Sequence, residues 1–203
     1  MKFKIVSLFV LCAILISCGT SRQGGKKQRK GTKAQVVLTP EQQRKYDYFF
    51  LEASRLKMKD DYSAAFDLLQ HCLTINPNAS SALYEISQYY MYLKQVPQGQ
   101  AALEKAVEND PDNYWYSQGL ASLYQQQNEM QKATNLLESM ATRFSDRMDP
   151  LYSLLDIYNR LEEYDNVITT LNRLEEKMGK NEQLSMEKFR IYLQKKDNQS
   201  AFR

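Results

Sequence analysis

The sequence is poor in the residues that enzyme sites most often require. Its 203 residues include one histidine, three cysteines, seven glycines and five prolines. The histidine, His71, precedes Cys72, and neighbouring residues on a helix point about 100° apart, so the pair cannot share a metal ion or a proton. The sequence also contains no glycine-rich phosphate loop and no metal-ligand spacing. We therefore expect no enzyme activity, no catalytic residue, no metal site and no cofactor.

Long hydrophobic runs are also scarce. One run, from Ile5 to Ile16, has twelve residues, which are too few to span a bilayer of about 30 Å as a helix. Basic residues precede it, and Leu15-Ile16-Ser17-Cys18 at its end resembles the lipobox of bacterial lipoproteins. The resemblance implies a signal peptide over residues 1–17 and acyl chains on Cys18 that hold the protein on a membrane.

This interpretation leaves few thiols in the mature chain. Cys12 is removed with the signal peptide and Cys18 carries the lipid, so Cys72 has no partner for an intrachain disulfide. We expect Cys72 to be buried and unreactive, and we expect packing to supply the stability.

Charge divides the chain into two parts of opposite sign. Residues 19–45 carry eight basic residues and one acidic residue, a net charge of +7, whereas residues 46–203 carry 17 basic and 23 acidic residues, a net charge of −6. We predict that residues 18–45 form a lipidated, basic and flexible linker. The basic stretch has no interleaved aromatic residues, so we expect no nucleic-acid partner; anionic lipid headgroups, or solvent alone, suit it better.

The residues that follow Cys18 bear on location. Some lipoproteins bound for the cell surface have an acidic run directly after the lipidated cysteine, and Gly19-Thr20-Ser21-Arg22-Gln23 has none. By that resemblance we predict a lipid anchor in the bacterial outer membrane, with the protein facing the periplasm.

The rest of the chain repeats every 34 residues. A large, mostly aromatic residue recurs at this spacing. A mostly small residue follows nine positions later, and a leucine follows four positions after that. The three sets are Leu56, Tyr90, Tyr124, Tyr158 and Tyr192; Ala65, Gly99, Ala133, Val167 and Ala201; and Leu69, Leu103, Leu137 and Leu171. The pattern resembles the tetratricopeptide repeat, a helix–turn–helix unit of this length. The resemblance implies an all-α, right-handed superhelical solenoid of antiparallel helix pairs, with units 46–79, 80–113, 114–147, 148–181 and a truncated 182–203.

The match to this repeat weakens along the chain. Small residues are expected where the two helices of a unit cross, but the fourth unit has Leu155, Val167 and Leu174 there, and the third has Met140. We expect these larger residues to spread the helix pairs. The fifth unit stops at the start of its second helix, and we expect that the sequence is a fragment of a longer protein.

The resemblance also supplies candidate binding residues. Tetratricopeptide arrays bind partners along the first helix of each unit, and the matching positions here are rich in rings and amides, which suit an extended peptide. The predicted peptide-binding groove comprises Phe50, Tyr84, Gln88, Tyr92, Trp115, Gln118, Ser122, Tyr152 and Asp156. The alternative is that many of these rings only pack between units. The Lys and Asn residues with which related co-chaperones grip acidic C-termini are missing, which disfavours that role.

These patterns predict a lipid-anchored scaffold that faces the periplasm and recruits another protein in an envelope assembly or secretion complex. One alternative is the targeting arm of a larger enzyme or sensor whose active domain lies beyond residue 203. Another is binding of a polysaccharide to the aromatic groove.

Overall fold

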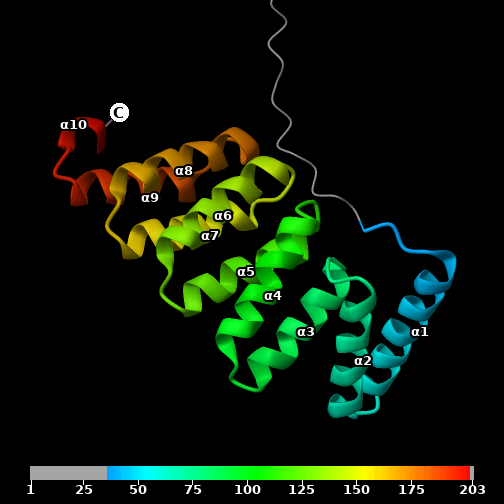
Figure 1. Ribbon diagram of the computed structural model, residues 1–203. Coiled ribbons are helices and arrows are strands. Elements are labelled where there is room, and N and C mark those ends of the chain that lie inside the picture. The colour runs from blue at the N-terminus through cyan, green and yellow to red at the C-terminus, as the bar shows by residue number, and fades with distance from the viewer. Residues whose placement is uncertain (1–35, 202–203) are drawn as a thin grey trace, which may run out of the picture. The chain divides into compact units, whose positions relative to one another are not determined.

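The computed structural model describes residues 36–201, and all regular structure in this range is helical. The helices follow one another as antiparallel neighbours (Figure 1). They are α1 Pro40–Lys57, α2 Tyr62–Ile75, α3 Ser80–Tyr92, α4 Val96–Asn109, α5 Tyr114–Gln126, α6 Met130–Arg143, α7 Asp149–Arg160, α8 Tyr164–Met178, α9 Glu182–Gln194 and the short α10 Asn198–Ala201. The predicted all-α class and the sequential pairing of helices are confirmed, and the superhelical hand stays a prediction. The predicted signal peptide, Cys18 and most of the predicted linker lie outside the described residues.

The helical region begins earlier than the sequence pattern predicts. The linker was expected to extend to residue 45, but α1 begins at Pro40. Thr39 explains the start, because its hydroxyl accepts a hydrogen bond from the Gln42 amide while the Gln42 side chain accepts one from the Thr39 amide. This capping box and a proline in the first turn define the N-terminal end of α1 through interactions between residues close in sequence.

The turn inside each helix pair repeats with the same 34-residue period. A non-glycine residue with φ of 56–60° lies in the turn after the first helix of each pair, at Asp60, Lys94, Asn128, Glu162 and Lys196. The next backbone amide donates to a carbonyl five residues back, from Asp61 to Leu56 at 3.0 Å and from Glu129 to Tyr124 at 2.8 Å, for example. These bonds satisfy the carbonyls that a helix end leaves unpaired. The backbone therefore repeats as regularly as the side-chain pattern.

Side-chain size in one column accounts for the spacing within the pairs. The backbones of α1 and α2, and of α3 and α4, lie close along more of their length than those of α5 and α6 or of α7 and α8. Where the two helices of a pair cross, one residue of the second helix is fully or almost fully buried. It is Cys72 or Ala106 in the close pairs, and Met140 or Leu174 in the wider ones. The expected spreading therefore occurs where the larger residues stand.

Tyrosines join each unit to the one before it. Tyr124 and Tyr158 are less than one-tenth exposed, and their hydroxyls donate to Glu104 at 2.9 Å and Glu138 at 3.3 Å, each in the preceding unit. Burial, followed by the hydrogen bond to Glu104, raises the pKa of Tyr124 well above its ordinary value. Tyr124 and Tyr158 therefore pack where one unit meets the next.

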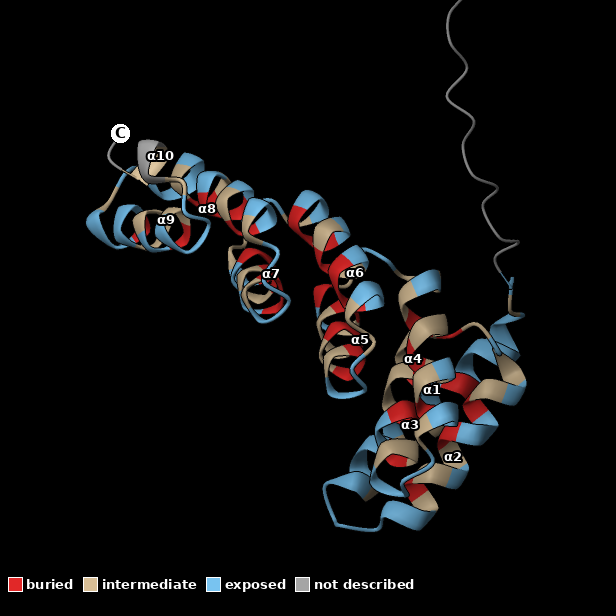
Figure 2. Cartoon of the chain, turned by 90° about the vertical axis from the view of Figure 1, so that its left-hand side faces the viewer, coloured by how far each residue is buried: buried red, intermediate tan, exposed pale blue. Residues whose placement is uncertain are grey.

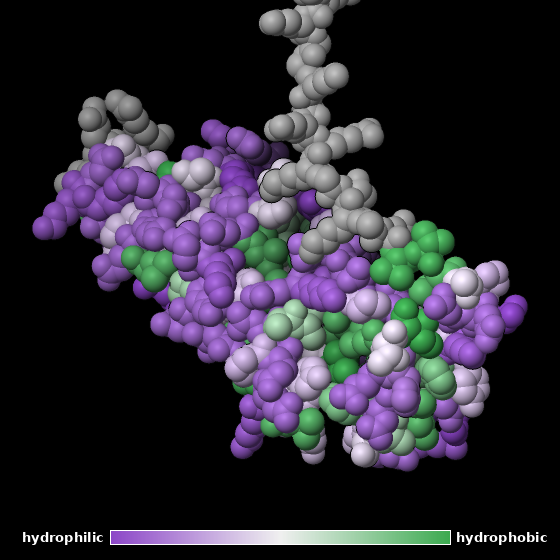
Figure 3. Space-filling view, viewed as in Figure 1, coloured by the Kyte–Doolittle hydropathy of each residue, from purple (hydrophilic) through white to green (hydrophobic). Residues whose placement is uncertain are grey.

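The core runs through the interior of the helical region as two clusters. One holds buried residues from α1, α2 and α3, and the other extends from α4 to α9 (Figure 2). On the outside, hydrophobic residues gather over α2 and the α3–α4 pair, whereas the surface over α6 to α9 is mostly hydrophilic on the face shown (Figure 3). Within the described residues, no helix combines the length and the hydrophobicity that a membrane span needs.

Candidate functional site

Two of the predicted groove residues, Phe50 and Tyr84, are half-buried and pack against neighbouring rings. The Phe50 ring stacks on Tyr46, with 5.9 Å between ring centroids. The ring centroids of Tyr84 and Tyr116 lie 4.8 Å apart. The Tyr84 ring also lies next to Gly119, where an added Cβ atom would contact it. Packing within α1 therefore takes up part of the surface of Phe50, and packing between units takes up part of that of Tyr84.

Amides and a hydroxyl follow at the next positions of the predicted groove. Gln118, which is half-buried, accepts a hydrogen bond from the Tyr114 hydroxyl at 3.1 Å. Ser122 is also half-buried, whereas Asp156 is exposed. Of these three side chains, Asp156 is the one most open to a partner.

Two predicted groove residues are large aromatic side chains with much exposed surface. Trp115, the second residue of α5, is 63% exposed, and the Arg147 guanidinium lies 5.6 Å from its ring and 4.0 Å from that of Tyr114. Tyr152 on α7 is 47% exposed, and its hydroxyl lies 3.3 Å from the sulfur of Met178. Arg147 holds the Tyr114–Trp115 pair in place by cation–π contact and leaves part of the indole free for a partner.

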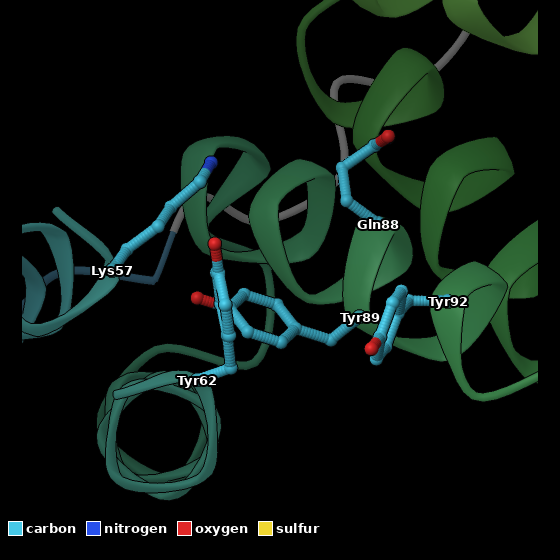
Figure 4. Close-up of a pocket in the computed structure, with 5 residues that line it drawn as sticks. All are labelled: Lys57, Tyr62, Gln88, Tyr89 and Tyr92. Carbon is cyan, nitrogen blue, oxygen red and sulfur yellow. The ribbon is translucent and has the colours of Figure 1, made fainter. Parts of the chain in front are cut away.

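The remaining two predicted residues, Gln88 and Tyr92, line one pocket. It has a volume of about 340 Å³ and lies among the end of α1, the start of α2 and the second half of α3. Its other lining residues are Lys57, Tyr62 and Tyr89 (Figure 4). Tyr92 is 81% exposed at its rim, whereas Tyr89 is only 8% exposed. The structure therefore brings together two of the nine predicted residues in a pocket with three that the pattern did not predict.

An ion pair from Lys57, which lines the pocket, joins α1 to α3. The Lys57 ammonium donates to the Glu85 carboxylate at 2.8 Å, and this bond raises the pKa of Lys57. Tyr62 donates its hydroxyl proton to Asp60 at 2.8 Å, which raises the pKa of Tyr62, and burial raises that of Tyr89. At neutral pH the pocket therefore presents a charged ammonium and neutral phenols.

Two of the three missed residues, Tyr62 and Tyr89, are tyrosines that stand near residues with assigned repeat positions. Tyr89, Tyr90 and Tyr92 stand together near the end of α3, and the repeat pattern assigns only Tyr90 to packing between units and Tyr92 to the groove. Tyr62 opens the second helix of the preceding unit. Neither Tyr62 nor Tyr89 occupies a repeat position that the resemblance associates with binding, so the pattern alone passed over them.

The adjacent residues His71 and Cys72 differ in their exposure to solvent, and the predicted burial of Cys72 is confirmed. His71 is exposed, while Cys72 is fully buried and unpaired. Burial raises the pKa of the Cys72 thiol to about 11, so the thiol is protonated at neutral pH and is a poor nucleophile. Residues 36–201 also contain no group of three or more His, Cys, Asp or Glu side chains arranged to hold a metal ion.

Comparison with known proteins identifies one repeat directly. A tetratricopeptide repeat family model matches residues 80–113, the span of α3, α4 and the loop that follows. The comparison with curated proteins found no match.

Solved structures share the fold over most of the chain. MamA 41-end from Desulfovibrio magneticus RS-1 has a TM-score of 0.56 and 14% identity, covering 77% of this chain and 89% of that one. A tetratricopeptide repeat protein from Parabacteroides merdae has a TM-score of 0.61 and 15% identity, covering 78% and 63%. YrrB, described as a tetratricopeptide repeat protein with an unusual peptide-binding site, has a TM-score of 0.59 and 13% identity, covering 79% and 84%.

The chain therefore has an all-α, tetratricopeptide-like fold with helices packed in sequential pairs. At these identities the similarity to the solved structures establishes the fold and not a shared partner.

Proposed function

We propose that the protein is a lipid-anchored scaffold with no chemistry of its own, which binds another envelope protein through its odd-numbered helices. The observation that carries this proposal is the set of large aromatic side chains that these helices leave exposed: Tyr92 at 81%, Trp115 at 63% and Tyr152 at 47%. Tryptophan and tyrosine dominate the binding energy of protein interfaces, because they bury a large area with few rotatable bonds.

Two further observations support a role in binding. Tetratricopeptide folds present a surface to partners rather than a catalytic cleft, and the similar structure YrrB is described as having a peptide-binding site. The most obvious nucleophile, Cys72, is buried and protonated at neutral pH.

The proposed location rests on the first 45 residues of the sequence. Leu15-Ile16-Ser17-Cys18 resembles a lipobox and supports a lipid anchor on Cys18. The lack of acidic residues directly after Cys18 favours the periplasmic side of the outer membrane. The basic stretch that follows can add contacts with anionic headgroups, each worth about 1 kcal/mol near the surface.

Co-purification of the full chain from membranes tests the scaffold. We expect a partner that is retained by the wild-type chain and lost when Trp115→Ala and Tyr152→Ala are combined. Ser139→Ala, at an exposed position on α6, serves as the control and should retain the partner. Retention of the same partner by the double variant would show that Trp115 and Tyr152 do not carry the binding.

A further inference from the structure

The pocket at the end of α1 contains a buried hydroxyl without a hydrogen-bond partner. The Tyr89 hydroxyl is buried, and it has no hydrogen-bond partner in the part of the chain that the structure describes. Figure 4 shows its ring extending from α3 toward the side of the pocket where Tyr62 and Lys57 lie. Buried polar groups are nearly always paired, and leaving one unpaired costs about 1–3 kcal/mol. An acceptor supplied by a ligand would remove this cost.

Lys57 adds further donors to the pocket, and Gln88 offers both an amide N–H and a carbonyl oxygen. The Lys57 ammonium has three N–H donors and uses one of them on Glu85. The Tyr62 hydroxyl already gives its proton to Asp60. Acceptor oxygens on a ligand would therefore pair with the Tyr89 hydroxyl and with the remaining Lys57 donors.

The walls of the pocket are aromatic. The Tyr62 ring lies 6.4 Å from that of Tyr89 at an interplanar angle of 61°, and 6.5 Å from that of Tyr92 at 31°. Tyr62 is 47% exposed and Tyr92 is 81% exposed, so both offer ring surface to a ligand. Spaced tyrosine rings with a hydroxyl donor suit proline residues, because proline packs on aromatic faces, has no N–H and leaves its carbonyl free.

We propose that this pocket binds a proline-containing segment of the partner protein in the extended polyproline II conformation. Proline rings pack on the exposed surfaces of Tyr62 and Tyr92, and the Tyr89 hydroxyl and the Lys57 ammonium donate to carbonyl oxygens of the segment. Such a segment is already ordered before binding, so it loses little conformational entropy. This inference rests on the proposed function in taking the ligand to be part of a protein.

A titration of the full chain in detergent with an octaproline peptide tests the proposal. The peptide is acetylated and amidated, so it carries no charge, and isothermal calorimetry measures its affinity. We expect saturable binding that Tyr92→Ala abolishes. Tyr48→Ala is the matched control, because Tyr48 is 65% exposed on α1 but does not line the pocket, and this variant should bind as the wild type does.

Tyr89→Phe tests the orphan hydroxyl separately from folding. The variant keeps the ring and removes only the oxygen, so its melting temperature should be unchanged or higher. Its affinity for octaproline should fall about 2- to 10-fold, the effect of losing one hydrogen bond. A folded Tyr89→Phe chain with wild-type affinity would contradict the assigned role of the hydroxyl.

Several results would overturn the proposal. They are absence of octaproline binding at millimolar concentration, equal binding of a capped glycine–serine octapeptide, and tighter binding of a capped octalysine, which would make the pocket a cage for cations. If octaproline fails to bind while Trp115→Ala with Tyr152→Ala still releases a membrane partner, the pocket assignment is wrong and the scaffold function stands.

Discussion

Overpacking the crossing of α1 and α2 should destabilise the first unit. Ala65 on α2 is fully buried, Ala53 on α1 is 2% exposed, and both belong to the cluster that also holds Leu69 and Cys72. Ala65→Leu adds three carbon atoms at a point where the two backbones lie close together. Overpacking of this kind costs about 1–3 kcal/mol. For a chain of this size, about 2–4 °C of melting temperature corresponds to each kcal/mol, so we expect a decrease of about 2–12 °C.

Two optical probes locate the damage along the array. Circular dichroism reports all the helices, whereas tryptophan fluorescence reports only the third unit, where Trp115 stands. Because repeat units unfold with partial independence, Ala65→Leu should shift the dichroism transition more than the fluorescence transition.

The same substitution at an exposed site supplies the control. Ala101→Leu on α4 adds the same atoms where solvent leaves room, and it should change stability by no more than about 0.5 kcal/mol. Equal melting temperatures for Ala65→Leu and Ala101→Leu would refute the close crossing of the two helices.

Three further predictions concern other parts of the chain. Leu174→Ala should cost about 2–5 kcal/mol in denaturant unfolding, because Leu174 is fully buried at the crossing of α7 and α8 and the substitution leaves a cavity; a loss below 1 kcal/mol would contradict that packing. Stability should fall as the pH rises above about 10, because the pKa of Tyr124 is higher in the folded chain than its ordinary value. The folded state therefore keeps a proton that the unfolded state releases. Melting curves at rising pH should show a smaller decrease in melting temperature for Tyr124→Phe than for the wild type, and an identical decrease would reject this role. Cys18→Ala should abolish palmitate labelling and retention in the membrane fraction, and a variant that stays in the membrane pellet would disprove the lipobox interpretation.

The sequence predicted the fold well because the determinants of the fold are local and periodic. The recurrence of a small residue and a leucine every 34 residues resembles the tetratricopeptide repeat, and this resemblance predicts paired helices. The turns at Asp60 and Lys94 fall where polar residues interrupt that pattern. The predicted start of α1 lay too far along the sequence. The repeat pattern begins at residue 46, whereas the Thr39 capping box starts the helix before the first repeat position.

The candidate site was harder to predict because repeat position does not determine exposure. Tyr84 and Tyr152 hold equivalent positions, but Tyr84 packs against Tyr116, whereas Tyr152 is 47% exposed. The tyrosine pocket depends on how Tyr62 of one unit meets Tyr89 of the next, and this contact between units has no counterpart in the repeat pattern.

Photocrosslinking in the intact cell tests the central claim, that the odd-numbered helices hold a protein partner. A photoreactive residue replaces Trp115 on α5 in one chain and the exposed Ser139 on α6 in another, and mass spectrometry identifies the adducts. The account predicts one dominant envelope protein linked from position 115 and not from position 139. No adduct from position 115, or the same adducts from both positions, would contradict it.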